Sequence, residues 1–182
     1  MKRLSVVFFG VLLVMAACGG DGDSAATPDK PVITAPVDSC DTGEASPPER
    51  PEFGLGSVLI ETDDGSRLVN VEVAQTDVQR QFGLMFERSL PEDSGMVFIF
   101  FEENEGGFYM RNTLLPLSIA YFDVDGKIIK IVDMEPCEED STLYDPGAPY
   151  RGALEVNQGL FEEWGVEEGD QVNIVPADTG GM

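Results

Sequence analysis

Two Asp-Gly pairs, each placed between segments in which apolar and polar residues alternate, constrain the fold of this chain most strongly. The pairs are Asp64-Gly65 and Asp125-Gly126. Asp-Gly favours a positive φ at both central positions of a tight turn, so each pair predicts a β-hairpin. Four further segments have the composition of strands: 96–101, 107–112, 152–156 and 171–175. The repeated strand signal predicts a mainly β fold.

Helical signals are few and short. Thr76 can cap a helix from Asp77 to about Phe82, which Gly83 would end. Residues 160–164 can form one more helical turn or two. About eight short strands with one or two short helices predict a small barrel or a folded-over antiparallel sheet.

The N-terminus has the features of a processing signal. Lys2 and Arg3 form a positive region, residues 4–17 are largely apolar, and Ala16-Ala17 provides small residues directly before Cys18. This apolar stretch falls short of the ~20 residues that a membrane-spanning helix needs. We therefore predict a lipoprotein signal peptide over residues 1–17, cleaved before a lipid-modified Cys18; an ordinary secretory peptide is the alternative. The lipid would insert in the bilayer, so the predicted location is the cell membrane, on its extracytoplasmic side.

Composition divides the rest of the chain into three parts. Residues 18–52 are rich in Asp, Ser, Thr, Ala, Gly and Pro, which predicts a lipidated cysteine followed by a flexible acidic tether with a mean reach of roughly 30 Å. Residues 53–176 are enough for a single β-rich domain with a hydrophobic core. Residues 177–182 form a predicted disordered tail.

Charge and the absence of histidine exclude several classes of function. The formal net charge is −23, and it becomes −25 when Lys2 and Arg3 leave with the signal peptide. Such an acidic balance argues against partners that require basic patches, namely nucleic acids and anionic lipid surfaces. The sequence contains no histidine, which excludes Ser-His-Asp and Cys-His catalysis and His-ligated metals. Paired carboxylates then remain as the acid–base route to an enzyme.

Two cysteines, Cys40 and Cys137, remain once Cys18 carries lipid. An even pair outside the cytoplasm suggests a disulfide that fastens the tether to the domain. Two free thiols or an intermolecular bond are the alternatives.

Short segments that occur in a fixed order between residues 58 and 175 resemble a known family. They include Gly83-Leu84-Met85-Phe86-Glu87-Arg88, Phe108-Tyr109-Met110-Arg111-Asn112-Thr113 and Leu154-Glu155-Val156. The series resembles the uncharacterised bacterial and archaeal family catalogued as domain of unknown function 192. The resemblance implies a compact β-rich domain, often exported, with no established activity. The family usually has Trp where this chain has Tyr109, and Asp where it has Ser118, so an acid that could serve chemistry in relatives is missing here.

The polar residues of the matched segments, together with one aromatic residue, are the candidate site residues. The predicted ligand-binding residues are Arg88, Tyr109, Arg111, Asn112, Glu155 and Asp170. Arginine offers a rigid fork for carboxylate or phosphate, and asparagine offers both a donor and an acceptor. One interpretation is a pocket with walls from Phe108, Tyr121 and Trp164. The other is structural, with an internal ion pair such as Arg88 with Glu155.

Three hypotheses about function follow. The leading one is a non-catalytic, exported domain that binds a small polar or anionic ligand or an envelope partner. A hydrolase-like enzyme that uses Glu155, Asp170 and Arg88 is the alternative, and a structural or assembly accessory with exposed Leu114 and Leu115 is the third. No cofactor or metal is predicted, because three motif methionines that could hold Cu(I) are expected to fill the core instead: Met85, Met96 and Met110.

Overall fold

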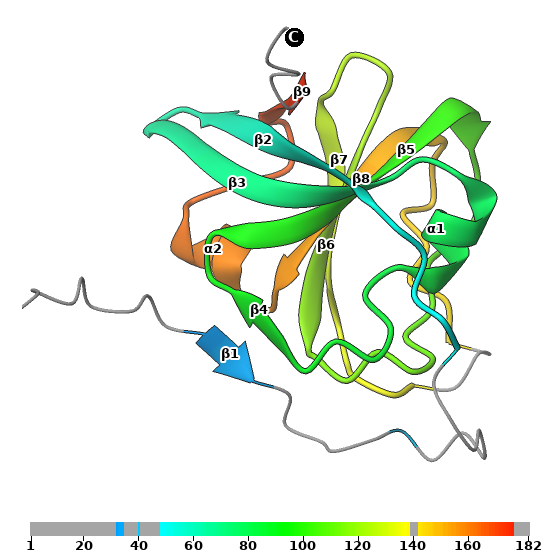
Figure 1. Cartoon of the computed structure of the whole chain (residues 1–182). Coiled ribbons are helices and arrows are strands. Elements are labelled where there is room, and N and C mark those ends of the chain that lie inside the picture. The colour runs from blue at the N-terminus through cyan, green and yellow to red at the C-terminus, as the bar shows by residue number, and fades with distance from the viewer. Residues whose placement is uncertain (1–31, 35–39, 41–47, 139–141, 177–182) are drawn as a thin grey trace, which may run out of the picture.

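The fold is built on a seven-stranded sheet that curls into a half-barrel (Figure 1). The computed structural model describes residues 32–34, 40, 48–138 and 142–176. The strands follow the order β7-β6-β8-β5-β3-β2-β9 across the sheet. Their bounds are β2 (Gly54–Thr62), β3 (Gly65–Ala74), β5 (Ser94–Asn104), β6 (Leu117–Phe122), β7 (Ile128–Met134), β8 (Tyr150–Asn157) and β9 (Gln171–Pro176). Neighbouring strands are antiparallel, except β3 and β5, which are parallel.

The two edges of the sheet approach each other, which confirms the predicted folded-over sheet. Lys127, just before β7, forms a bridge with Gln171 at the start of β9. The backbone N–H of Val172 donates to the carbonyl oxygen of Gly126 at 2.8 Å. A Cβ atom at Gly126 would lie 2.4 Å from the carbonyl oxygen of Val172, and φ there is +82°. The close approach and the backbone conformation both require glycine at position 126.

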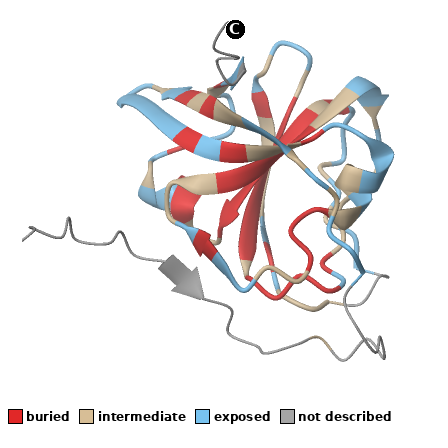
Figure 2. Cartoon of the chain, in the orientation of Figure 1, coloured by how far each residue is buried: buried red, intermediate tan, exposed pale blue. Residues whose placement is uncertain are grey.

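The sheet carries a hydrophobic cluster on each face (Figure 2). On β6, Ile119 and Tyr121 belong to one cluster, whereas Ala120 and Phe122 belong to the other. Alternate residues of a strand point to opposite faces, so β6 is buried on both sides.

The two clusters are completed by different segments. α2 (Leu160–Glu163) buries Leu160 and Phe161 against the face of Ala120, and we name this cluster the helix-side core. Buried residues of the segments 84–90 and 108–115 complete the cluster on the face of Ile119, and we name it the loop-side core.

The first helix, α1 (Asp77–Phe82), begins and ends where the sequence predicts. The hydroxyl oxygen of Thr76 accepts from the backbone N–H of Gln79 at 3.3 Å, and the Gln79 side chain accepts from the backbone N–H of Thr76 at 3.0 Å. This reciprocal capping box satisfies two N–H groups that the first helical turn leaves unpaired. Gly83 ends the helix with a φ of +52°.

The two hairpins occur where predicted, but their turns differ from the expected type. In the first, Thr62 pairs with Gly65, so Asp63-Asp64 forms the loop and Gly65 already belongs to β3. In the second, the side chain of Asp123 accepts from the backbone N–H of Asp125 at 2.9 Å. The described residues with positive φ that are not glycine include no aspartate. The expected positive φ at both central positions is therefore wrong, because the first loop is shifted by one residue and an Asx turn shapes the second.

The predicted strand at 107–112 is wrong. Within this segment, Phe108 forms an isolated β-bridge with Tyr144, and Asn112 adopts a left-handed φ of +57°. Asparagine tolerates this conformation better than most residues, so the chain can turn here. The apolar side chains are nevertheless buried, with Met110 only 1% exposed, because the segment lies over the loop-side core.

Parts of the predicted tether contact the domain. β1 (Val32–Thr34) pairs with β4 (Ser89–Pro91), and the guanidinium of Arg50 lies 2.8 Å from the carboxylate of Glu87. Cys40 and Cys137 form the predicted disulfide, with Cα atoms 5.3 Å apart. Residues 1–31, with the signal peptide and Cys18, lie outside the described residues, as does the tail at 177–182, so these assignments stay predictions. No helix within the described ranges is long and apolar enough to cross a bilayer.

Candidate functional site

A pocket of about 240 Å³ lies between α1, the turn that follows it, and the strands β5 and β8. Drug-sized ligands typically occupy pockets of roughly 300–1,000 Å³, so this one suits a smaller molecule. Residues far apart in sequence line it, from Asp77 on α1 to Glu155 on β8. The pocket therefore exists only when α1, β5 and β8 are assembled.

Aromatic rings form the wall of the pocket. Phe98 and Phe100 come from β5, Phe108 comes from the segment over the loop-side core, and Tyr150 comes from β8. Phe108 stands edge-on to Phe98, with ring centroids 4.8 Å apart, and Phe100 stands edge-on to Tyr150 at 5.4 Å. Tyr121, behind the wall, contacts both Phe108 and Tyr150. Such edge-to-face contacts hold the rings in fixed orientations.

Glu155 is the most unusual residue of the pocket. It lies within β8, opposite Met96 of β5 and Ile119 of β6, and both of these neighbours are fully buried. Glu155 itself is only 5% exposed. Within the described part of the chain, its carboxyl group forms no hydrogen bond and no ion pair. Burial raises the pKa of this carboxyl group from its ordinary value of 4.5 to about 8.

An isolated buried acid of this kind needs an explanation. Burying a polar group without a partner costs free energy, so nearly all such groups in native proteins are hydrogen-bonded. A carboxyl group that lines a pocket can obtain its partner from a ligand, and strongly shifted pKa values are concentrated at functional sites. Glu155 therefore identifies this pocket as the candidate site.

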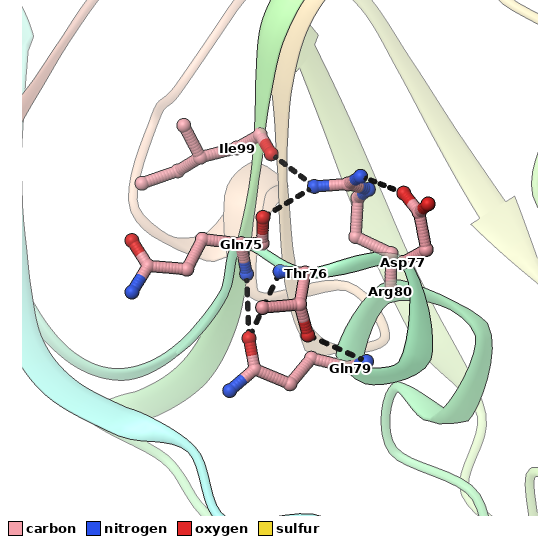
Figure 3. A network of polar contacts seen from close by, with 6 residues as sticks. All are labelled: Gln75, Thr76, Asp77, Gln79, Arg80 and Ile99. Carbon is pink, nitrogen blue, oxygen red and sulfur yellow. Dashed lines mark hydrogen bonds and ion pairs between the residues drawn. The ribbon is translucent and has the colours of Figure 1, made fainter.

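The arginine that lines the same pocket, by contrast, has several partners within the protein (Figure 3). The guanidinium of Arg80 donates to the backbone carbonyl oxygens of Gln75, at 2.7 Å, and Ile99, at 2.9 Å. It also forms an ion pair with Asp77 and lies 4.9 Å from the ring centroid of Phe100. Arg80 thus fastens the start of α1 to β5, and its charge is paired with that of Asp77.

Hydrogen bonds also fix the hydroxyl groups of three tyrosines at the pocket. The hydroxyl of Tyr150 accepts from the side-chain amide of Asn104 at 2.5 Å, and the hydroxyl of Tyr109 donates to the carbonyl oxygen of Gln81 at 3.0 Å. The hydroxyl of Tyr121 donates to the carbonyl oxygen of Tyr144. Burial raises the pKa of both Tyr121 and Tyr150, so their hydroxyl groups stay protonated.

The loops that border the pocket are tied to each other. The backbone N–H of Phe86 donates to the carbonyl oxygen of Asn112 at 2.8 Å, and that of Cys137 donates to the carbonyl oxygen of Thr113 at 3.0 Å. Thr113 lines the pocket, so this hydrogen bond connects the pocket wall directly to Cys137 and its disulfide.

The structure brings two of the six predicted site residues, Tyr109 and Glu155, to the pocket. The other four do not line it: Arg88, Arg111, Asn112 and Asp170. Arg88 and Arg111 are exposed, and the guanidinium of Arg111 lies 5.4 Å from the ring centroid of Tyr109. Asp170 accepts from the backbone N–H of Glu167 at 2.8 Å, before β9.

Several alternatives from the sequence do not agree with this geometry. The ion pair of Arg88 with Glu155 is not formed, because the Glu155 carboxyl group has no charged partner among the described residues. Leu114 and Leu115 are 3% and 0% exposed, so the predicted exposed apolar patch is wrong. The three methionines considered for Cu(I) are buried, as expected of residues that fill a core, and Met85 also lines the pocket: Met85, Met96 and Met110.

Sequence reasoning missed some wall residues and misplaced others. Phe98, Phe100 and Tyr150 line the pocket, but an aromatic residue in a predicted strand is indistinguishable from a core residue. Trp164, a predicted wall residue, instead packs against Phe161 on the helix-side core. No sequence signal separates these cases.

Ser118, where relatives usually have Asp, has a structural position. Its hydroxyl group lies 2.5 Å from a carboxylate oxygen of Asp133 and accepts from the backbone N–H of Gly159 at 2.9 Å. It therefore links β6, β7 and the start of α2, and it does not line the pocket of Glu155. Within the described ranges, no group of three His, Cys, Asp or Glu residues is placed to hold a metal ion.

Fold and pocket together define the class of this protein: a β-rich half-barrel domain with an aromatic-walled pocket around a buried acid. The model of a sequence family described as uncharacterised, domain of unknown function 192, matches residues 58–174. The chain belongs to this family, which confirms the resemblance seen in its sequence segments.

Two solved bacterial structures are similar to the chain. One, from Sinorhizobium meliloti 1021, is described as a proposed transcription regulator; it is 31% identical with a TM-score of 0.65, and the match covers 69% of this chain and 98% of that one. The other, a protein of unknown function from Novosphingobium aromaticivorans DSM 12444, is 29% identical with a TM-score of 0.63, covering 72% and 95%. A comparison with curated proteins found no match.

Proposed function

We propose that this protein is an exported, lipid-anchored domain that binds a small organic molecule in the pocket around Glu155, without chemical conversion. The observation that carries the proposal is the isolated Glu155 carboxyl group, buried within a sheet and lining a pocket. A purely structural acid at this position would be expected to have a partner within the protein.

The pocket favours a polar neutral or cationic ligand over the anionic ligand that the arginines of the sequence suggest. Arg88 and Arg111 do not line the pocket, and the charge of Arg80 is paired with Asp77. An anion in the pocket would therefore meet the acid Glu155 and an arginine that is already ion-paired. The hypothesis of a structural or assembly accessory loses its support from sequence, because Leu114 and Leu115 are buried.

A hydrolase-like mechanism has weaker support than binding. A carboxyl group with a pKa of about 8 could act as a general acid. The second carboxylate would have to be free and close by, however, and Asp170 does not line the pocket. Asp77 does line it, but forms an ion pair with Arg80. Transcriptional regulation, which is said of one similar protein, is disfavoured for this chain by its net charge of −23.

A fragment screen by methyl NMR tests ligand binding. Met85 lines the pocket, whereas Met134 is buried elsewhere in the loop-side core, so the two methyl resonances form an internal comparison. Pocket ligands should shift the Met85 signal more than the Met134 signal, and Glu155→Gln should weaken binding. Asp170→Asn is the matched acid-to-amide control outside the pocket. Failure of every fragment to shift Met85, or equal binding to Glu155→Gln, contradicts the proposal.

The lipid anchor has a separate test. The apolar stretch before Cys18 and the disulfide between Cys40 and Cys137 support export to an oxidising compartment. In a bacterial host, the wild-type protein should sediment with membranes and carry an acylated N-terminal cysteine by mass spectrometry. Cys18→Ser should release it, or leave it uncleaved. A wild-type protein recovered without lipid contradicts the anchor.

A further inference from the structure

We infer that the pocket selects a small organic cation, with Glu155 as its counter-ion and the aromatic wall as its cation–π surface. This inference rests on the proposed binding function and specifies the chemical class of the ligand. It is carried by the charges, rings and hydrogen bonds at the pocket.

The pocket has a net negative charge when Glu155 is ionised. Three residues with formal charges line it: Asp77, Arg80 and Glu155. Asp77 and Arg80 neutralise each other in an ion pair, so Glu155 holds the uncompensated charge once it ionises. A positive ligand group beside it would supply the missing partner, and the overall charge of −23 also attracts cations to the protein.

The wall has the second feature that organic cations require. The face of an aromatic ring is negative, and cations bind within about 6 Å of the ring centroid, most strongly where water is excluded. The wall already holds one cation of the protein, since Arg80 lies 4.9 Å from the centroid of Phe100. Among the described residues, no arginine or lysine lies over the rings of Phe98, Phe108 or Tyr150, and all three residues line the pocket.

The remaining polar groups do not favour another class of ligand. The side chains of Tyr109 and Asn104 donate to partners within the protein, as does the hydroxyl of Thr113, to the carbonyl oxygen of Arg111 at 3.5 Å. A sugar needs several donors and acceptors, whereas much of this pocket's lining is aromatic and its polar side chains other than Glu155 and Gln81 already bond within the protein. A compact alkylammonium group, which satisfies rings and carboxylate without directed hydrogen bonds, fits best.

Binding of a cation should depend on pH in a defined way. With a pKa of about 8, Glu155 is roughly one-tenth ionised at pH 7 and nine-tenths ionised at pH 9. The apparent affinity scales with the competent fraction, so it should rise about tenfold over this range. The other charged or titratable groups around the pocket are Asp77 and Arg80, which are paired, Arg111, whose guanidinium lies over the ring of Tyr109, and the hydrogen-bonded Tyr109, Tyr121 and Tyr150.

The test compares choline with 3,3-dimethyl-1-butanol, its uncharged isostere, and with acetate, on the purified full-length protein. Binding is followed through the Met85 methyl resonance. Choline should bind about tenfold or more tightly than the isostere at pH 9 and about tenfold more weakly at pH 7 than at pH 9. Glu155→Gln should lose this preference, and Asp170→Asn should retain it.

Other outcomes overturn the inference. Equal or tighter binding of the uncharged isostere at both pH values would contradict a preference for cations. The proposed binding of a small molecule would remain. Preferential binding of acetate would also contradict a preference for cations and leave small-molecule binding in place. Absence of choline binding also overturns the inference, whereas the proposed function is judged separately by the fragment screen. If Glu155→Gln fails to fold, two measurements on the wild-type protein still test the inference: the pH dependence of choline binding and the comparison of choline with its uncharged isostere.

Discussion

Replacing Glu155 with glutamine should stabilise the protein, and the gain should grow with pH. The carboxyl group has a pKa of about 8 in the folded protein, against an ordinary value of 4.5. An acid whose pKa rises on folding favours the folded state at low pH. Below pH 4.5 Glu155 is largely protonated in both states, so it does not oppose folding. Between pH 4.5 and about 8 it ionises in the unfolded chain but not in the folded protein, and the folded state is progressively destabilised. Glutamine has a similar shape and no charge, so it removes this dependence.

The two pKa values fix the size of the effect. Each pKa unit corresponds to about 1.4 kcal/mol, so Glu155 should cost about 1.4 kcal/mol of unfolding free energy at pH 5.5. The cost should reach about 3 kcal/mol at pH 7 and level off near about 5 kcal/mol at pH 9. These values are differences in unfolding free energy between the wild-type protein and Glu155→Gln.

Urea denaturation at pH 5.5, 7 and 9 measures the effect, with tryptophan fluorescence as the signal because the chain has a single Trp. Taking the difference between the two proteins cancels the titration of the many surface carboxylates that both share. Asp170→Asn is the control, and its difference from wild type should not follow the same pH profile. Parallel curves for wild type and Glu155→Gln across this range would refute the reasoning, because they would mean that Glu155 is solvated like a surface acid.

Three further predictions concern stability. Thr76→Ala removes the capping-box hydroxyl of α1 and should cost about 1 kcal/mol by urea denaturation; an unchanged midpoint would contradict the cap. Cys40→Ser opens a cross-link across 97 residues and should cost about 2–5 kcal/mol, with reduction of the wild-type protein giving the same loss. Gly152→Ala should cost about 2 kcal/mol or more, since its Cβ would lie 2.2 Å from a neighbouring ring, whereas Gly54→Ala, with no atom nearer than 3.7 Å, should cost less; equal losses would refute the packing argument.

Local chemistry explains which elements could be predicted from sequence. Thr76 and Gly83 bound α1 as expected, because capping depends on residues within one helical turn. The hairpins followed from alternation of apolar and polar residues over the strands. The turn types could not be predicted in this way, because a single-residue shift in register or an Asx turn alters φ in the turn without altering the alternation of apolar and polar residues along the strands. Residues 107–112 alternate like a strand, but their burial comes from covering the loop-side core.

The site was harder to predict, for a physical reason. Tyr109 and Glu155 occur in motifs, whereas the isolation of Glu155 follows from its neighbours Met96 and Ile119 on other strands. Arg88 and Arg111 have the chemistry of anion binding, but nothing in their local sequence shows that they do not line the pocket. Phe100 and Tyr150 have no local signal at all. Burial and pairing are properties of the assembled sheet, so they become visible only when the strand order is known.

The single parallel pair in the sheet has a consequence for the pocket. Parallel neighbours cannot be joined by a tight turn, so β3 and β5 are connected by the longer segment 75–93. Seven of the sixteen residues that line the pocket come from this connection. This connection therefore supplies α1 and the turn after it to the pocket, so a change in its sequence would alter the pocket without altering the order of the strands.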